Sequence, residues 1–163
     1  MTKIEKLELI SGFEKAYSLI DSLIAGRPKE ALSFVPPIRD AWSINDHLVH
    51  LLDADVSCAF RIRASVAEPG FAIPVWDEEA WQARLRYAEE DGLACLAEAE
   101  AMRARLAAFL RRIVDEDWSG FQVEHPKRGR LDLASLLAMY REHVAFHAPL
   151  VKRNLEALGK AAR

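Results

Sequence analysis

Prolines and glycines gather in three short clusters of this 163-residue chain, and their placement constrains the fold more than any other feature. The clusters lie at 26–37, 69–74 and 120–129. The four long segments outside them are 2–25, 43–66, 77–116 and 132–158, in which the only breakers are Gly12, Gly92 and Pro149. Because glycine and proline punctuate regular structure, each long segment is expected to form continuous secondary structure.

Apolar residues within these segments recur at spacings of three and four, which is helical periodicity. In the first segment the stripe consists of Ile10, Phe13, Tyr17, Ile20 and Ile24. The second segment begins after Ser43, an N-cap residue that has Asp46 three residues later as the acidic member of a capping box. The third segment opens at Asp77 and is long for a globular helix, so Gly92 is expected to divide it.

Four long amphipathic helices predict an all-α fold, a four-helix bundle in which each helix buries its apolar face. The connections between the helices are longer than a simple up-down bundle needs, and the first, 26–42, is expected to cross over or to form part of a site. Alternation from Phe121 to Glu124 predicts a short extended piece. With 51% hydrophobic residues, the chain is expected to be a single bundle domain over 1–163.

The composition disfavours several classes of partner. A formal charge of −3 argues against nucleic-acid binding, and the lack of a run of about 18 apolar residues argues against a transmembrane helix. Two cysteines, Cys58 and Cys95, are too few for a disulfide framework. We therefore expect a cytoplasmic protein that acts on a small molecule and has no nucleic-acid or membrane partner.

Five histidines carry the functional argument. His143 and His147 are four residues apart in the last segment and fall inside its apolar stripe. That spacing stacks two imidazoles on one helix face, the usual way in which a helix offers two ligands to one metal ion. The alternative is that both are hydrogen-bonded core or interface residues, since each ring has two nitrogens that need partners.

A third ligand would come from the second segment, which holds His47 and His50. Periodicity slightly favours His47, but the segment is apolar on more than one side, so periodicity leaves both open. Three protein ligands leave a coordination position for water or substrate, as in catalytic metal sites. His125 lies beside Pro126 in a predicted turn and is expected to be an exposed loop residue.

Two stretches of the chain resemble motifs of the DinB/YfiT-like family. In one, the Trp-Ser pair at Trp42 is followed, eight residues after the tryptophan, by the histidine and leucine at 50 and 51. The other is the His-x-x-x-His pattern at 143–147. The resemblance implies a four-helix bundle, often a homodimer, that binds Zn²⁺ or Ni²⁺ through His50, His143 and His147. It further implies either transfer of a low-molecular-weight thiol or hydrolysis by an activated water.

Polar residues beside the implied ligands are the candidates for a catalytic role. His47, Asp46 and Asp55 could each orient a ligand ring or act as a base. Asp55 is favoured because it lies on the apolar stripe, where an unpaired carboxylate is costly. Asp55 could equally be the buried partner of an arginine. Elsewhere, Lys127, Arg128 and Arg130 form a basic turn that either contacts a substrate carboxylate or faces solvent.

Three hypotheses follow from these features. The first is a metal-dependent enzyme, with thiol transfer slightly favoured over hydrolysis by analogy with the family. The second is a non-enzymatic, stress-related helical bundle that binds a metal or a small ligand, because no general base other than Asp55 is evident. The third is a structural dimer module whose histidines only pack.

Overall fold

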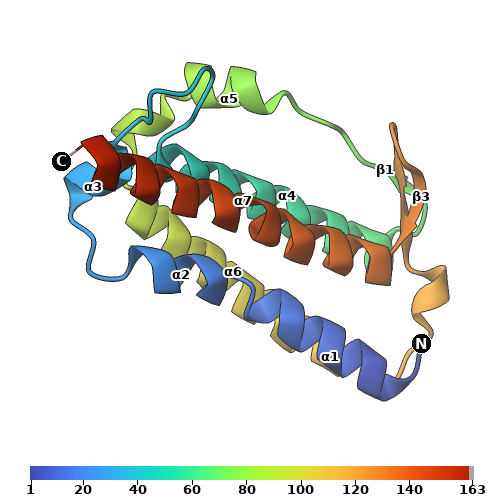
Figure 1. Ribbon diagram of the computed structural model, residues 1–163. Helices are drawn as coiled ribbons and strands as arrows, with labels where there is room; N and C mark the ends of the chain where they lie inside the picture. Colours follow the sequence, from blue (N-terminus) through green and yellow to red (C-terminus); the bar gives the residue numbers. More distant parts are fainter. Residues whose placement is uncertain (162–163) are drawn as a thin grey trace.

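Four long helical segments run side by side in the computed structural model, which describes residues 1–161 (Figure 1). The first segment consists of α1 (Lys3–Glu14) and α2 (Ser18–Ile24), and the other three are α4 (Ile44–Ala67), α6 (Gly92–Arg112) and α7 (Leu133–Ala161). Both α1 and α4 pack against α6 and α7, which closes the bundle around an apolar core. The predicted four-helix bundle is confirmed.

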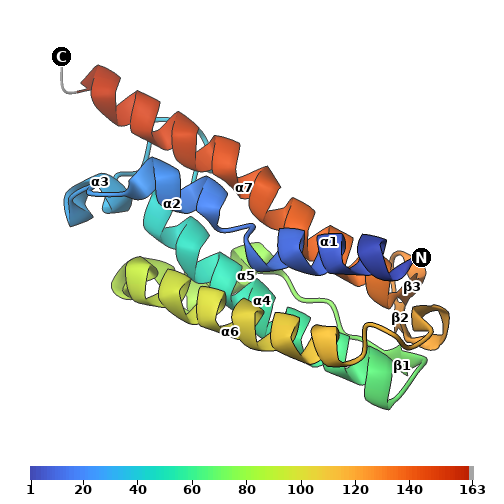
Figure 2. The same ribbon diagram turned by 90° about the horizontal axis from the view of Figure 1, so that it is seen from below.

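The long connection between α4 and α6 determines the topology. It contains β1 (Phe71–Ala72), α5 (Glu78–Arg84) and the 3₁₀ turn η1 (Tyr87–Glu89), and it returns along the bundle before α6 begins (Figures 1 and 2). The first turns of α4 and α6 are therefore neighbours, and the side chain of Asn45 accepts a hydrogen bond from Gly92 N at 3.0 Å. Because of this return, the connection passes over α4 and α7, where it covers the histidines described below.

A small sheet closes the end of the bundle opposite α5. Strand β1 pairs in parallel with β2 (Gln122–His125), which pairs antiparallel with β3 (Gly129–Asp132). The extended piece expected from Phe121 to Glu124 is thus real, and the fully buried Val123 joins the sheet to the core. The prediction of an all-α chain missed the other two strands, which are short and lack a distinct alternating pattern.

The first predicted helix, 2–25, is wrong in one respect, because it breaks between α1 and α2. The carbonyl of Phe13, which would accept from Tyr17 N in a continuous α-helix, instead accepts from Arg103 Nη1 at 3.1 Å and, less closely, from Ala16 N at 3.4 Å. Short-range bonds tighten the chain there, such as Ser18 N to Lys15 O at 3.1 Å. A tertiary contact therefore overrides the helical periodicity, which continues unbroken through this region.

The predicted helix starts agree with the structure more closely. Ser43 caps α4 in a capping box with Asp46, as expected. The segment 77–116 is divided, with α6 beginning at Gly92 as predicted and Asp77 capping the separate helix α5. Two further short elements are α3 (Lys29–Ser33), inside the first connection, and the 3₁₀ turn η2 (Trp118–Gly120). No helix within residues 1–161 combines the length and hydropathy that a membrane span requires.

The contact between Asn45 and Gly92 leads to a stability prediction. A Cβ atom at position 92 would lie 2.7 Å from Asn45 Oδ1 and 3.2 Å from Asn45 O, so the Gly92→Ala variant must displace a buried, hydrogen-bonded side chain. We expect this variant to lose about 1–3 kcal/mol of unfolding free energy in urea denaturation. Gly159→Ala, also in a helix but facing open space, is the matched control and should be neutral or stabilising. Equal effects at the two positions would contradict the close approach.

Candidate metal centre

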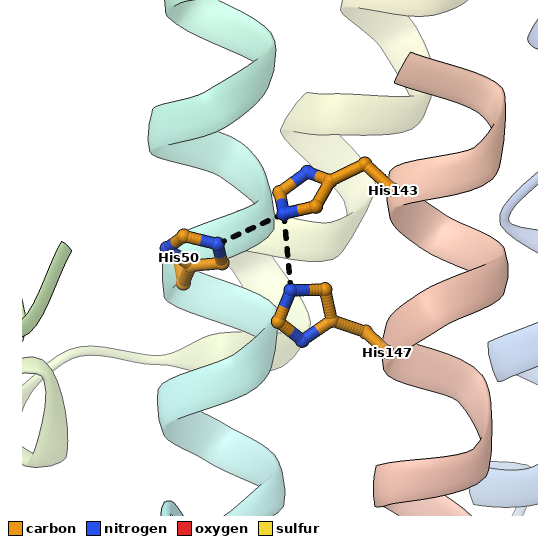
Figure 3. Close-up of side chains that lie close together, drawn as sticks. All are labelled: His50, His143 and His147. Atoms are coloured by element: carbon orange, nitrogen blue, oxygen red, sulfur yellow. Dashed lines mark hydrogen bonds between the residues drawn. The ribbon is translucent and has the colours of Figure 1, made fainter. Parts of the chain in front are cut away.

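Three histidines meet between α4 and α7 (Figure 3). His50 lies two turns into α4, whereas His143 and His147 lie one turn apart on the facing side of α7. The Nε2 atom of His143 is 3.1 Å from Nε2 of His50 and also 3.1 Å from Nε2 of His147. The structure thus brings together the three residues that the family resemblance implies as ligands.

The spacing of these nitrogens fits a divalent ion. Metal–nitrogen distances of about 2.0–2.1 Å place the ligands of a tetrahedral ion about 3.3 Å apart, close to the observed contacts. Nitrogen lone pairs that converge without a cation repel one another, and each neutral ring has only one N–H to offer. Imidazole suits zinc and nickel among the common metals. The donor set and its geometry therefore favour a cation of this class at the centre.

Burial keeps all three rings in the neutral form that binds metals. It lowers the pKa of His50 to about 3, of His143 to about 4 and of His147 to about 2. Neighbouring histidines lower the values of His50 and His147 further, since a second positive charge would be close by. At neutral pH each ring therefore has a lone pair available for a ligand bond.

His47 contacts the ring of His147. Its Nδ1 atom is 3.0 Å from Nδ1 of His147, on the side of that ring that faces away from the other two histidines. A proton on Nδ1 of His147, donated to His47, leaves the lone pair of Nε2 directed at the cluster. This is the contact expected of a residue that orients a ligand ring, so the periodicity that favoured His47 reflected its burial beside the site.

Two tryptophans hold His50 in place. The Trp42 ring centroid lies 5.2 Å from that of His50 and the Trp76 centroid lies 5.4 Å away. Nδ1 of His50 is buried and has no hydrogen-bond partner among the described residues. At the Nδ1 edge, aromatic packing rather than a hydrogen bond thus holds this ring.

The histidine cluster opens onto a cavity of about 940 Å³. Its walls come from α4, from the start of α5 and the connection before it, from the β2–β3 hairpin and from α7. His50 and His143 line this cavity, whereas His147 lies at a smaller neighbouring pocket beside Trp42. A small molecule in the larger cavity would therefore have direct access to the nitrogens.

One carboxylate near the cluster was missed by the sequence analysis. Glu78, the first residue of α5, places its Oε2 atom 3.9 Å from Nε2 of His50. In the sequence Glu78 is only an acidic residue in the first turn of a helix, where a carboxylate interacts favourably with the helix dipole. No local pattern connects it to His50, because the returning connection alone brings the two together.

Asp55 has a different environment from the one expected of a base. Arg103 donates to both of its carboxylate oxygens, from Nε at 2.6 Å and from Nη2 at 2.8 Å, and Tyr17 donates its hydroxyl at 2.9 Å. Within residues 1–161 none of the hydrogen bonds of Asp55 goes to a histidine. The structure therefore supports the alternative interpretation, a buried partner for an arginine.

The prediction that His125 is an exposed loop residue is wrong. It ends strand β2, is half-buried and lines the cavity together with Lys127 and Arg128. Its Nδ1 atom accepts hydrogen bonds from the backbone N–H groups of these two residues, at 3.1 and 3.3 Å. Arg130, the third residue of the basic turn, instead forms an exposed ion pair with Glu124.

Comparisons with known proteins agree with this architecture. The sequence model of the DinB superfamily matches residues 13–150. Over 114 residues the chain is 29% identical to the "Putative metal-dependent hydrolase YfiT" of Bacillus subtilis (strain 168), a stretch that covers 68% of this chain and 63% of that protein. The matched stretch thus spans less than two thirds of that relative.

A solved structure gives the same result for the fold. YfiT from Bacillus subtilis, described as a probable metal-dependent hydrolase with an unusual four-helix bundle topology, is similar with a TM-score of 0.85. The sequence identity is 22%, and the similarity covers 98% of this chain and 90% of the other. At that identity the likeness establishes the shared four-helix bundle fold.

Proposed function

This chain belongs to the DinB superfamily, and on that premise we propose that it is a metal-dependent hydrolase acting on a small molecule. The observation that carries the proposal is the convergence of the Nε2 atoms of three neutral histidine rings. Two of these rings, those of His50 and His143, line the cavity of about 940 Å³. His50, His143 and His147 would hold a divalent ion, Zn²⁺ or Ni²⁺. When bound, such an ion lowers the pKa of a water at its open position and so supplies a nucleophile near neutral pH.

The residues around the cluster have separate tasks in this proposal. Glu78 lies where it can accept a proton from a group beside Nε2 of His50. His47 orients His147 through the contact between their Nδ1 atoms. Trp42 and Trp76 restrict the access of bulk water to His50, because their rings pack against it.

Thiol transfer at the same ion is the competing reaction, and it was slightly favoured by family analogy. Hydrolysis is preferred because Glu78, a carboxylate of the cavity lining, can act as the general base that the sequence did not reveal. The same carboxylate weakens the case for a non-enzymatic binder. A homodimer remains a prediction from the resemblance.

Replacing Glu78 by glutamine tests the proposal directly. The variant keeps the size of the side chain but cannot accept the proton, so kcat/KM should fall by about 10- to 100-fold, less than for a buried base because water can substitute. The assay uses metal-loaded protein with a panel of p-nitrophenyl esters, amides and phosphate esters. Metal content, measured by elemental analysis, should stay as in the wild type.

Two comparisons make this experiment selective. Glu89→Gln, which removes an exposed carboxylate paired with Arg86 outside the cavity, is the matched control and should keep full turnover. Each assay is repeated with added glutathione and cysteine. Turnover that requires a thiol would reject hydrolysis in favour of transfer, and equal rates for Glu78→Gln and the wild type would remove Glu78 from the mechanism.

A further inference from the structure

A buried arginine without a carboxylate partner faces the same cavity. Arg61, near the end of α4, is only 8% exposed and is one of the cavity-lining residues. Its Nη1 atom donates to the hydroxyl of Tyr140 at 2.8 Å and its Nη2 atom donates to the carbonyl of Pro74. Both acceptors are neutral, and within the described part of the chain Arg61 forms no ion pair.

Burying a charged side chain without a partner of opposite charge costs free energy. A second buried arginine of this chain shows the usual compensation. The other deeply buried guanidinium, Arg103, is neutralised by Asp55 through two hydrogen bonds. A guanidinium keeps its charge at any physiological pH and offers five N–H donors in a planar fork. Arg61 therefore lacks the anion that its burial calls for, and the side on which an anion can reach it is the cavity.

Other donors line the cavity at the same end. Lys127 and Arg128 project from the β2–β3 turn, and both are exposed. Because Nδ1 of His125 already accepts two backbone N–H groups, the proton of the neutral ring lies on Nε2, which becomes a donor. Burial lowers the pKa of His125, and the positive charges of Arg61, Arg128 and Lys127 lower it further. The ring is therefore a neutral donor within a positive environment.

Two acidic lining residues lie at the histidine end of the cavity. Glu142 is adjacent to His143, and Glu78 approaches His50; the remaining two are Asp77 and Glu79, at the start of α5. Along α4, the eleven residues from His50 to Arg61 separate their Cα atoms by about 16 Å. The cavity is thus polarised, with the histidine cluster and carboxylates at one end and the cations at the other.

We propose that the end of the cavity at Arg61, His125, Lys127 and Arg128 binds a carboxylate or phosphate group of the substrate. This inference rests on the proposed function for the reacting end, because it places the bond to be cleaved at the histidines and the anionic group at Arg61. Arg61 donates two of its five N–H groups to Tyr140 and Pro74, so further N–H groups are left for the oxygens of an anion. The substrate class is therefore a small molecule with an anionic group at some distance from its reactive bond.

The test measures anion binding on protein freed of metal by a chelator, so that no anion can bind to the ion. Inorganic phosphate and succinate are titrated at constant ionic strength. The readouts are calorimetry and intrinsic tryptophan fluorescence, to which Trp76 in the cavity lining contributes. Arg61→Gln should weaken the binding of the preferred anion by about tenfold or more. Arg61→Lys keeps the positive charge but loses the planar set of N–H donors, so its affinity for the anion should lie between those of the wild type and Arg61→Gln.

Exposed variants keep the test valid if a change at Arg61 disturbs folding. The double variant Lys127→Gln/Arg128→Gln alters only exposed side chains and should weaken binding by about two- to fivefold. Arg130→Gln, in the same hairpin but paired with Glu124, is the matched control and should bind as the wild type does. Whichever probe binds more tightly identifies the anionic group.

Two results would overturn the anion site. One is a wild-type protein that binds neither phosphate nor succinate, and the other is unchanged binding in both the Arg61→Gln and the double variant. Metal content is measured in parallel to separate this inference from the proposed function. A wild-type protein that binds an anion but no divalent metal would refute the hydrolase proposal alone. A wild-type protein that binds the metal but neither anion would refute the anion site alone.

Discussion

Replacement of His143 by alanine is expected to remove the divalent ion from the protein, because Nε2 of this ring lies between those of the other two histidines. Wild-type protein without a polyhistidine tag should retain about one Zn²⁺ or Ni²⁺ per chain after dialysis. The variant should retain almost none. Removing a residue that only supports a ligand typically costs about 10- to 100-fold in affinity, and the loss of a ligand should exceed that.

Thermal unfolding gives a second measurement of the same site. Added metal should raise the melting temperature of the wild type, since a ligand of the native state stabilises by about 4 kcal/mol at a thousand times its Kd. His143→Ala should show no such rise, whereas the control His125→Ala, at the far end of the cavity, should behave as the wild type does. If wild type and His143→Ala contain equally little metal, the histidines only pack and the metal centre is rejected.

Loss of the buried charge pair is expected to have the largest effect on stability. The Asp55→Ala variant leaves the guanidinium of Arg103 inside the core, where it is fully buried and packs 4.6 Å from the ring centroids of Phe13 and Tyr17. Breaking a buried pair in this way costs about 3–5 kcal/mol. For a chain of this size the melting temperature should fall by about 10 °C or more.

The appropriate controls distinguish a structural from a catalytic role for Asp55. The double variant Asp55→Ala/Arg103→Met removes both charges and should recover part of the lost stability. Lys3→Ala, which breaks an exposed pair with Asp115, should change stability by less than about 1 kcal/mol. A stable Asp55→Ala protein with normal metal content but greatly reduced turnover would return Asp55 to the catalytic residues.

Local sequence patterns predicted the helices well because helical contacts are local. The stripe in α4 and the capping box of Ser43 and Asp46 depend on residues three or four positions apart, so both can be read from the chain. The break between α1 and α2 could not be predicted, since it depends on a hydrogen bond from Arg103, ninety residues after Phe13.

The choice between His47 and His50 shows where periodicity fails. Both side chains are buried, because α4 has neighbours on several sides, and a helical wheel cannot separate two faces that are both covered. Resemblance to a family motif favoured His50. The structure places Nε2 of His50 against His143 and directs His47 at the opposite side of the His147 ring.

The sequence by itself determined the bundle and the pair His143 and His147, because one helical turn fixes both their spacing and their shared face. Only the tertiary structure decided the partners of that pair. Glu78 reaches the cavity from the returning connection and Arg61 reaches it from the far end of α4. Asp55 forms a buried ion pair with Arg103 instead of contacting the histidines. These contacts depend on how the helices and connections pack. They join residues that are far apart in the chain, so no local spacing in the sequence reveals them.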